Sequence, residues 1–180
     1  MTIMSTLATR LATPERLDRF RQAMRRFPSG VTVVTGRVND RTHGITVSSF
    51  CSVSMQPPLV LVCLNNVGRA AEALLSADKF AINILAAGQE SVSNACAGPR
   101  GEEWLTAATS RVGADEVPVV RGATAALVCT MFNRYPAGDH TIVLGHVDEV
   151  ILGSDRMPLA YHDGSYVRLP MDPPRSEINQ

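Results

Sequence analysis

The chain has 180 residues, a length that favours one domain. It carries 17 Lys and Arg against 17 Asp and Glu, and this balance argues against a nucleic-acid-binding protein, because such proteins carry a basic excess. Hydrophobic residues make up 45% and charged residues 19%, which is enough apolar side chain for a core and too little charge for a disordered chain. The longest apolar run, residues 59–64, is far shorter than the roughly 20 residues of a membrane span, so we expect no membrane partner.

The N-terminal segment is rich in arginine and has two possible interpretations. Arginine-rich, acid-poor starts occur in organelle transit peptides. Against this, Thr13 is a good N-cap, Pro14 suits the first helical position, and apolar residues follow at helical spacing. We favour an amphipathic helix over residues 14–27 that belongs to the fold, a flexible segment before it over 1–13, and a cytoplasmic protein, because no signal-peptide core is visible. The apolar positions are Leu17, Phe20, Met24 and Phe27.

The rest of the sequence predicts mostly strands. A polar turn is expected over 39–44 and a loop over 98–101, and two more short helices are expected over 68–77 and 88–97. The strands do not alternate regularly with helices, which favours a mostly antiparallel barrel over a doubly wound α/β fold. We expect the tail from Pro170 to be loosely ordered. The expected strands are 31–35, 45–53, 59–64, 80–85, 117–120, 123–134, 140–151 and 164–169.

The four cysteines carry no metal or disulfide pattern. None of Cys51, Cys63, Cys96 and Cys129 stands at a zinc-ligand spacing from another, and disulfides are not expected without a secretion signal. We therefore expect small buried hydrophobic residues. None of the four histidines has metal-ligand spacing to another histidine or a carboxylate, so we expect no metal site.

Several catalytic motifs are missing from the sequence. GxGxxG after a strand and GxxxxGK[ST] do not occur, which disfavours the Rossmann fold and the P-loop. GxSxG does not occur either, which disfavours a serine hydrolase of the nucleophile-elbow type.

Three places could carry binding chemistry. Residues 46–50 alternate hydroxyls with apolar groups, so they predict either a ligand-binding strand end or an ordinary solvated sheet edge. Arg69 begins a predicted helix, where an anion would be favoured, but it is equally compatible with a solvated surface arginine. His140 follows a Gly-Asp turn between two strands, and a loop histidine of this kind is more often a plain surface residue.

The order of these segments resembles the short-chain flavin reductase family, the small component of two-component flavin-dependent monooxygenases. Each motif is weak alone, and the ordered set covers nearly the whole chain, from about 18 to 169. The resemblance implies one domain over 14–169, followed by a flexible terminus over 170–180. It also implies a mainly β split β-barrel of the Greek-key, FMN-binding type with a few short helices. The segments are 20–35, 44–50, 52–63, 80–85, 138–140 and 158–166.

The resemblance also implies an activity. Such a protein binds FMN or FAD, reduces it with hydride from NADH or NADPH, forms a homodimer and supplies reduced flavin to a separate oxygenase. No side-chain acid or base is required, because hydride passes from nicotinamide C4 to flavin N5. Arg69 is implied to contact the phosphate, His140 the nicotinamide, and Tyr166 to close the pocket. The flavin contacts carried over from the family are Thr46, Val47, Ser48, Ser49, Cys63, Leu64 and Asn65.

One departure and two alternatives remain open at this point. Relatives commonly carry an Asp-Arg-Phe-like segment where this chain has residues 101–104, which end in Trp104. A non-catalytic flavin- or haem-binding protein on the same barrel is one alternative. The other is a barrel oxidase that keeps its flavin, as pyridoxamine-phosphate oxidases do. Both alternatives predict a retained cofactor, whereas the reductase predicts weak flavin binding.

Overall fold

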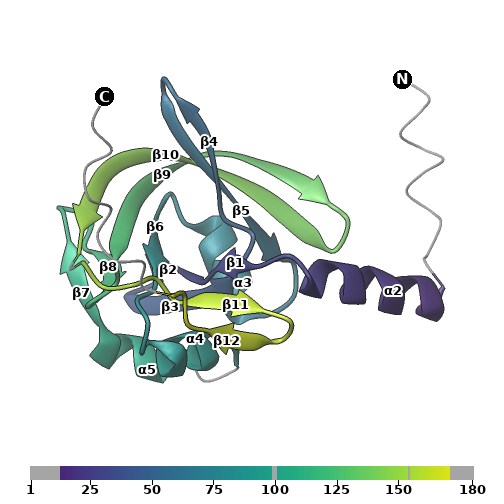
Figure 1. The fold of residues 1–180 in the computed structure, drawn as a ribbon. Helices are drawn as coiled ribbons and strands as arrows, with labels where there is room; N and C mark the ends of the chain where they lie inside the picture. Colours follow the sequence, from purple (N-terminus) through teal and green to yellow (C-terminus); the bar gives the residue numbers. More distant parts are fainter. Residues whose placement is uncertain (1–12, 99–100, 154, 171–180) are drawn as a thin grey trace, which may run out of the picture.

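The protein is mainly β with a few short helices, as expected, and every described strand pair is antiparallel (Figure 1). The computed structural model describes residues 13–98, 101–153 and 155–170. The described helices are α2 (Pro14–Arg25), α3 (Arg69–Ser76), α4 (Glu90–Ala97) and α5 (Gly101–Ala108). The described strands are β1 (Ser29–Gly30), β2 (Thr32–Val38), β3 (Arg41–Val47), β4 (Cys51–Met55), β5 (Pro58–Asn65), β6 (Lys79–Ile84), β7 (Thr109–Val112), β8 (Val117–Val120), β9 (Ala125–Ala137), β10 (His140–Leu152), β11 (Ala160–His162) and β12 (Ser165–Val167).

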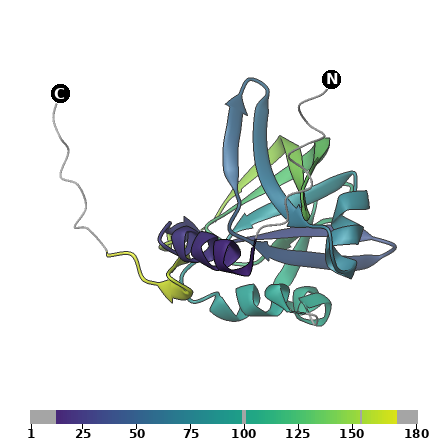
Figure 2. The ribbon, with the colours of Figure 1, turned by 90° about the vertical axis from the view of Figure 1, so that its right-hand side faces the viewer.

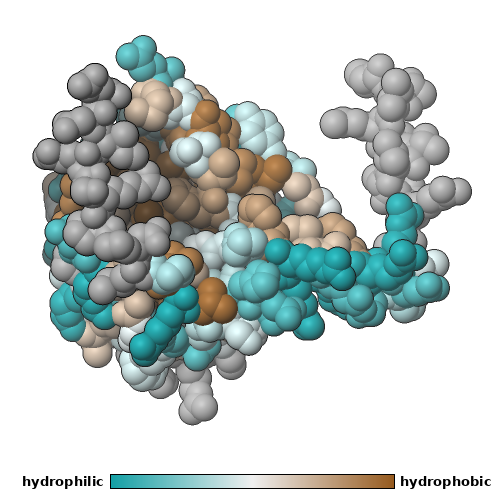
Figure 3. Space-filling model, in the orientation of Figure 1, coloured by the Kyte–Doolittle hydropathy of each residue, from teal (hydrophilic) through white to brown (hydrophobic). Residues whose placement is uncertain are grey.

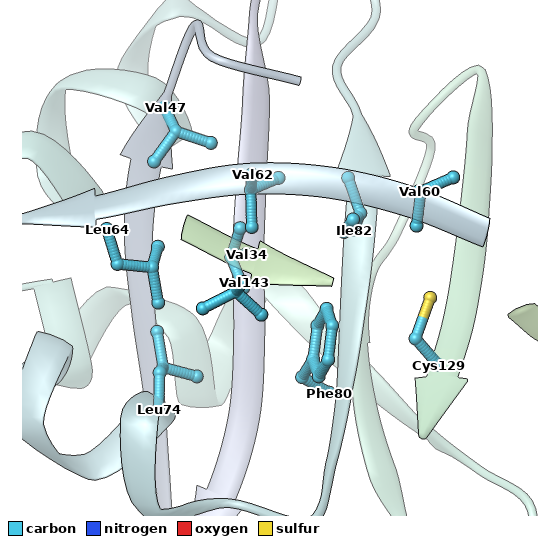
Figure 4. Close-up of a cluster of buried hydrophobic side chains, with 10 residues drawn as sticks. All are labelled: Val34, Val47, Val60, Val62, Leu64, Leu74, Phe80, Ile82, Cys129 and Val143. Carbon is cyan, nitrogen blue, oxygen red and sulfur yellow. The ribbon is translucent and has the colours of Figure 1, made fainter. Parts of the chain in front are cut away.

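A seven-stranded sheet in the order β3-β2-β6-β9-β10-β5-β4 forms the body of the molecule. The sheet is strongly curved. The curvature brings Val47, near one edge, and Val62, near the other, into the same buried cluster (Figure 4). Phe80 and Ile82 of β6 fill the middle of this cluster. On β5 alternate side chains point into this core, whereas β2 and β6 are buried on both faces, because further buried clusters lie behind them.

Helices α4 and α5 cover a second core beneath β3, on the side away from the β4–β5 hairpin (Figures 1 and 2). Leu105 of α5 is fully buried there together with Val31 and Leu159. Gly44 of β3 permits this approach, since a Cβ at that position would lie 2.4 Å from Leu105 Cδ1. Helix α5 was not predicted, and the expected loop over 98–101 lies partly outside the described residues.

Helix α2 differs from its prediction in how it packs. Thr13 caps it as expected, with Arg16 N donating to Thr13 Oγ1 at 3.3 Å, but the helix ends at Arg25 and buries no residue. It projects from the body (Figures 1 and 2), and Phe20 and Phe27 are 62% and 70% exposed. The amphipathic helix is therefore present, but the described part of its own chain does not bury its apolar face, because helical periodicity defines an apolar face and not what covers it.

The chain around β3 also differs from prediction. The segment expected as one strand over 45–53 is split between β3 and β4. The turn before it is shorter than expected, because Asn39 and Asp40 alone adopt positive φ values of 50° and 61° and Arg41 already belongs to β3. Asn and Asp tolerate this backbone region better than other non-glycine residues, which lets a two-residue turn close the hairpin.

The cysteines are free thiols, as expected, but they are not all buried. Cys96 and Cys129 are buried, and burial raises the pKa of each thiol to about 12, so both stay protonated at neutral pH. Cys51 is exposed and Cys63 half-buried, which corrects the expectation of uniformly buried cysteines. Both lie in the β4–β5 hairpin.

Candidate functional site

A hollow of about 340 Å³, here called the central hollow, opens where β3 ends. Thr46, Val47 and Ser48 form one wall of it. Helix α4 and the β11–β12 hairpin form the others, with Ser93, Asn94, Ala97, Tyr161, Gly164 and Tyr166. Four of the predicted site residues therefore meet in one place: Thr46, Val47, Ser48 and Tyr166.

Hydrogen bonds hold the walls of the central hollow in place. The Thr46 hydroxyl donates to the Ser93 carbonyl at 2.7 Å. The Tyr166 hydroxyl lies 2.7 Å from Asn94 Oδ1 and 2.9 Å from Ser93 Oγ, and its ring packs edge-on against Tyr161 with centroids 5.4 Å apart. Ser48 is exposed and its hydroxyl has no hydrogen-bond partner among the described residues, so it is available to a ligand.

A second hollow of about 390 Å³, the α3 hollow, adjoins the first and shares Ala97 with it. Gly68 and Arg69 at the start of α3 line it. Gly68 is the N-cap, with φ of 109° and no side-chain cap, so no side chain satisfies the first N–H groups of the helix. Exposed N–H groups, the helix dipole and the Arg69 guanidinium together favour an anion here.

The other predicted residues line neither of these hollows. Ser49 and Cys63 bind each other, since Ser49 Oγ accepts from Cys63 N at 2.9 Å and donates to Cys63 O at 3.1 Å. This link joins the end of β3 to β5. Leu64 is 1% exposed and belongs to the core, so only its backbone is available to a ligand.

Asn65 and His140 lie opposite each other where β5 and β10 pair. Asn65 Oδ1 accepts from Val67 N at 2.8 Å, and His140 Nδ1 lies 2.7 Å from Asp139 Oδ1. The hydrogen bond and charge of His140 lower the pKa of Asp139, which keeps that carboxylate ionised. His140 Nε2 is the ring nitrogen left for a ligand.

The sequence missed part of the central hollow. Ser93 and Asn94 lie in a predicted helix whose polar residues followed no recognisable motif. Tyr161 and Gly164 lie in segments of the family pattern but were not singled out as site residues. Trp104, at the departure from that pattern, is exposed on α5.

The described residues contain neither a metal-binding cluster nor a membrane-spanning helix. Among residues 13–98, 101–153 and 155–170, no group of three or more His, Cys, Asp and Glu side chains could hold a metal ion. Within the same ranges, no helix is both long and apolar enough to cross a membrane.

Comparison with known proteins gives consistent matches. The model of the flavin reductase like domain matches residues 24–170. The chain is 39% identical over 152 residues to the reductase component of 4-hydroxyphenylacetate 3-monooxygenase from Thermus thermophilus, covering 84% of this chain and 96% of that one. It is also 39% identical over 155 residues to an NADH-dependent FMN reductase of Streptomyces nodosus, covering 83% of each.

A solved structure agrees with these matches. The NADH:FAD oxidoreductase of Streptomyces globisporus, in complex with NAD and FAD fragments, superimposes with a TM-score of 0.81 at 32% identity. The match covers 93% of this chain and 99% of that one. The family model matches residues 24–170 of this chain, and the relatives above are 32% to 39% identical to it. The chain therefore belongs to the family of proteins with the flavin reductase like domain.

Proposed function

We propose that this protein is an NAD(P)H-dependent flavin reductase that reduces FMN or FAD and supplies the reduced flavin to a separate monooxygenase component. The observation that carries the proposal is the central hollow, with hydroxyls on one wall and two tyrosines on another, next to an anion-binding helix start. The relatives support it, being named as reductase components and as NADH-dependent FMN or FAD reductases.

The proposed chemistry asks little of the side chains. Flavin and nicotinamide, when bound, supply the hydride transfer themselves. The protein binds and orients the two rings and excludes water, which brings them to reacting distance. Ser48 offers a hydroxyl to the flavin ring, Tyr161 and Tyr166 form an aromatic wall, and Arg69 holds the phosphate. Ser49, Cys63, Leu64 and Asn65 are proposed to contribute through the backbone beside this strand end.

The activity test is a steady-state assay of NADH and NADPH oxidation with FMN and FAD in turn. We expect turnover that depends on added flavin, and a purified protein with little yellow colour. No oxidation of either donor with either flavin would refute the proposal. A visible spectrum that shows stoichiometric flavin or haem after purification would favour the cofactor-retaining alternatives.

We further propose that residues 14–169 form a split β-barrel domain that works in the cytoplasm, where NADH and NADPH are available. Support for the barrel comes from the curvature of the sheet. Val47 of β3 shares a core with Val60 and Val62 of β5. Ser49, just after β3, forms hydrogen bonds to the backbone of Cys63 in β5.

We propose that the protein is a homodimer. Figure 3 shows apolar residues gathered above α2, over the strands of the main sheet. The apolar stripe of α2 and half-buried outward residues of the sheet, among them Leu61 and Leu144, are not covered within the described chain. A second copy would cover them, and obligate dimers bury on the order of 2,000 Å² or more.

Light scattering at micromolar concentration is expected to give about twice the mass of one chain. Phe20→Glu on the exposed apolar stripe should shift the protein towards monomer, because a carboxylate would be buried in the interface. Arg19→Glu places the same group at a polar position of α2 and should leave the dimer intact. A monodisperse wild-type monomer would contradict the proposal.

His140 is proposed to contact the carboxamide or the pyrophosphate of NAD(P)H through Nε2. His140→Ala should raise the KM for NAD(P)H several-fold, as expected for one hydrogen bond of about 1 kcal/mol, with flavin affinity nearly unchanged. Steady-state kinetics with varied NADH at saturating flavin measure this. An unaltered KM, or a loss confined to flavin binding, would make His140 an ordinary surface histidine.

A further inference from the structure

Two turns carry the proposed phosphate and nicotinamide contacts, and they lie next to each other. The first, here called the α3 turn, covers 66–68 and leads from β5 to Arg69 at the start of α3. The second, the hairpin turn, covers 138–139 and leads from β9 to His140 at the start of β10. Since His140 pairs with Asn65 at the end of β5, the two turns continue the same antiparallel ladder.

Asn66 joins the two turns by hydrogen bonds in both directions. Its backbone N–H donates to the Asp139 carbonyl at 3.0 Å. Its side-chain Oδ1 accepts from the Thr141 hydroxyl at 2.7 Å. These bonds hold the residue before His140 and the residue after it, so the position of Asn66 determines that of the backbone that carries the imidazole.

The other end of α3 is tied to the same hairpin. The Arg134 guanidinium of β9 donates to the carbonyl of Ala77, the C-cap of α3, at 3.0 Å. Met131 N donates to the Asp78 carbonyl at 2.8 Å. The segment that starts at Asn66 therefore bonds to the β9–β10 hairpin at both ends, which couples the position of α3 to that of the hairpin.

Both turns are exposed to solvent, so hydrogen bonds rather than burial set their positions. Asn66, Arg69 and Asp139 are all exposed, and each turn contains an exposed glycine with positive φ, 109° at Gly68 and 68° at Gly138. An exposed turn loses conformational freedom when a ligand holds it. A second ligand that needs the same order then loses less, which gives positive coupling between the two ligands.

We propose that Asn66 and Thr141 are positioning residues, which transmit binding of the flavin phosphate to the nicotinamide contact at His140. The inference rests on the proposed function, in which Arg69 binds that phosphate. A phosphate held at the start of α3 fixes the α3 turn, and the two bonds of Asn66 then fix the backbone on both sides of His140. The enzyme therefore binds NADH more tightly beside a flavin with a phosphate than beside the same ring without one.

The test compares FMN with riboflavin, which has the same ring and no phosphate, on the intact protein. The KM for NADH is measured at a saturating concentration of each flavin. In the wild type we expect this KM to be about fivefold lower with FMN, which corresponds to the roughly 1 kcal/mol of one hydrogen bond. Thr141→Val removes the hydroxyl donor, suits a strand and should remove most of the difference. Asn66→Ala removes the acceptor and should do the same.

Two controls separate transmission from a loss of structure. Thr141→Ser keeps the hydroxyl and should keep the difference between FMN and riboflavin. Asn133→Ala removes the same group as Asn66→Ala from an exposed position of the same hairpin. The Asn133 side chain bonds to Arg134 N and Tyr135 Oη of its own strand, so this variant should also keep the difference.

Hydrogen exchange gives a readout that does not depend on turnover. FMN without any nicotinamide should slow amide exchange at residues 66–69 and at residues 138–141 of the wild type. In Thr141→Val, FMN should slow exchange at residues 66–69 alone. Riboflavin should protect both turns less than FMN does, because it has no phosphate to hold the start of α3.

The remaining outcomes each decide the question. An active wild type with the same KM for NADH beside both flavins would overturn this inference and leave the proposed function standing. A difference that Thr141→Val and Asn66→Ala leave unchanged would also overturn it, because the phosphate would then act without this bridge. So would an equal loss of NADH affinity beside both flavins, which a purely structural role predicts. A wild type that oxidises neither NADH nor NADPH with FMN or FAD would refute the proposed function and the inference with it.

Discussion

Replacing Arg69 with alanine is expected to weaken FMN binding by about ten- to a hundredfold, because a hydrogen bond to a charged group contributes roughly 1.5–3 kcal/mol. Arg69 is exposed at the start of α3, and its side chain makes no hydrogen bond or ion pair with another described residue, so its removal should leave the fold unchanged. Fluorescence titration of the flavin measures the Kd, and circular dichroism checks the fold.

Riboflavin provides the control for this effect, since it has the same ring and no phosphate. Arg69→Ala should bind riboflavin as the wild type does, and Arg69→Lys should retain part of the affinity for FMN. If the variant lost affinity equally for FMN and riboflavin, Arg69 would act on the ring or on the shape of the hollow. An unchanged Kd for FMN would remove Arg69 from the site.

Replacing Asn83 with leucine is expected to destabilise the protein by about 3 kcal/mol, because the substitution leaves buried polar groups without partners. Asn83 has 0% exposure at the centre of β6. Its Nδ2 donates to Val33 O at 2.8 Å and to Thr35 Oγ1 at 2.9 Å, and its Oδ1 accepts from Val120 N at 2.8 Å. One amide therefore joins β2, β6 and β8.

Urea and thermal unfolding measure this loss. A change of about 3 kcal/mol corresponds to a melting temperature lower by roughly 6–12 °C for a chain of this size. Asn133→Leu makes the same change at an exposed strand position and should alter stability by less than about 0.5 kcal/mol. A stability for Asn83→Leu within that margin would show that the network contributes little.

Local patterns were enough to find most of the strands. Residues 32–35 of the β-branched run and the apolar run at 59–64 lie in strands, because alternation and β-propensity are properties of neighbouring residues. The same patterns missed α5. Its first turn follows a glycine- and proline-containing segment that predicts a loop, and its core contact is Leu105 against Gly44, far away in the sequence.

Asn83 shows, at a single position, that local sequence patterns do not predict long-range contacts. The sequence places a polar side chain in the middle of an apolar strand, which marks the position as unusual. Its partners at residues 33, 35 and 120 come from two other strands, and no local pattern connects them.

By itself, the sequence determined the mainly β class, the cap of α2, the hydroxyl-bearing strand end and, through the order of its segments, the family. Only the tertiary structure decided that α2 buries none of its residues and that the central hollow unites residues near 47, 94 and 164. The reason is physical. Side-chain periodicity depends on backbone geometry within a few residues, whereas a hollow depends on how separate elements pack against one another.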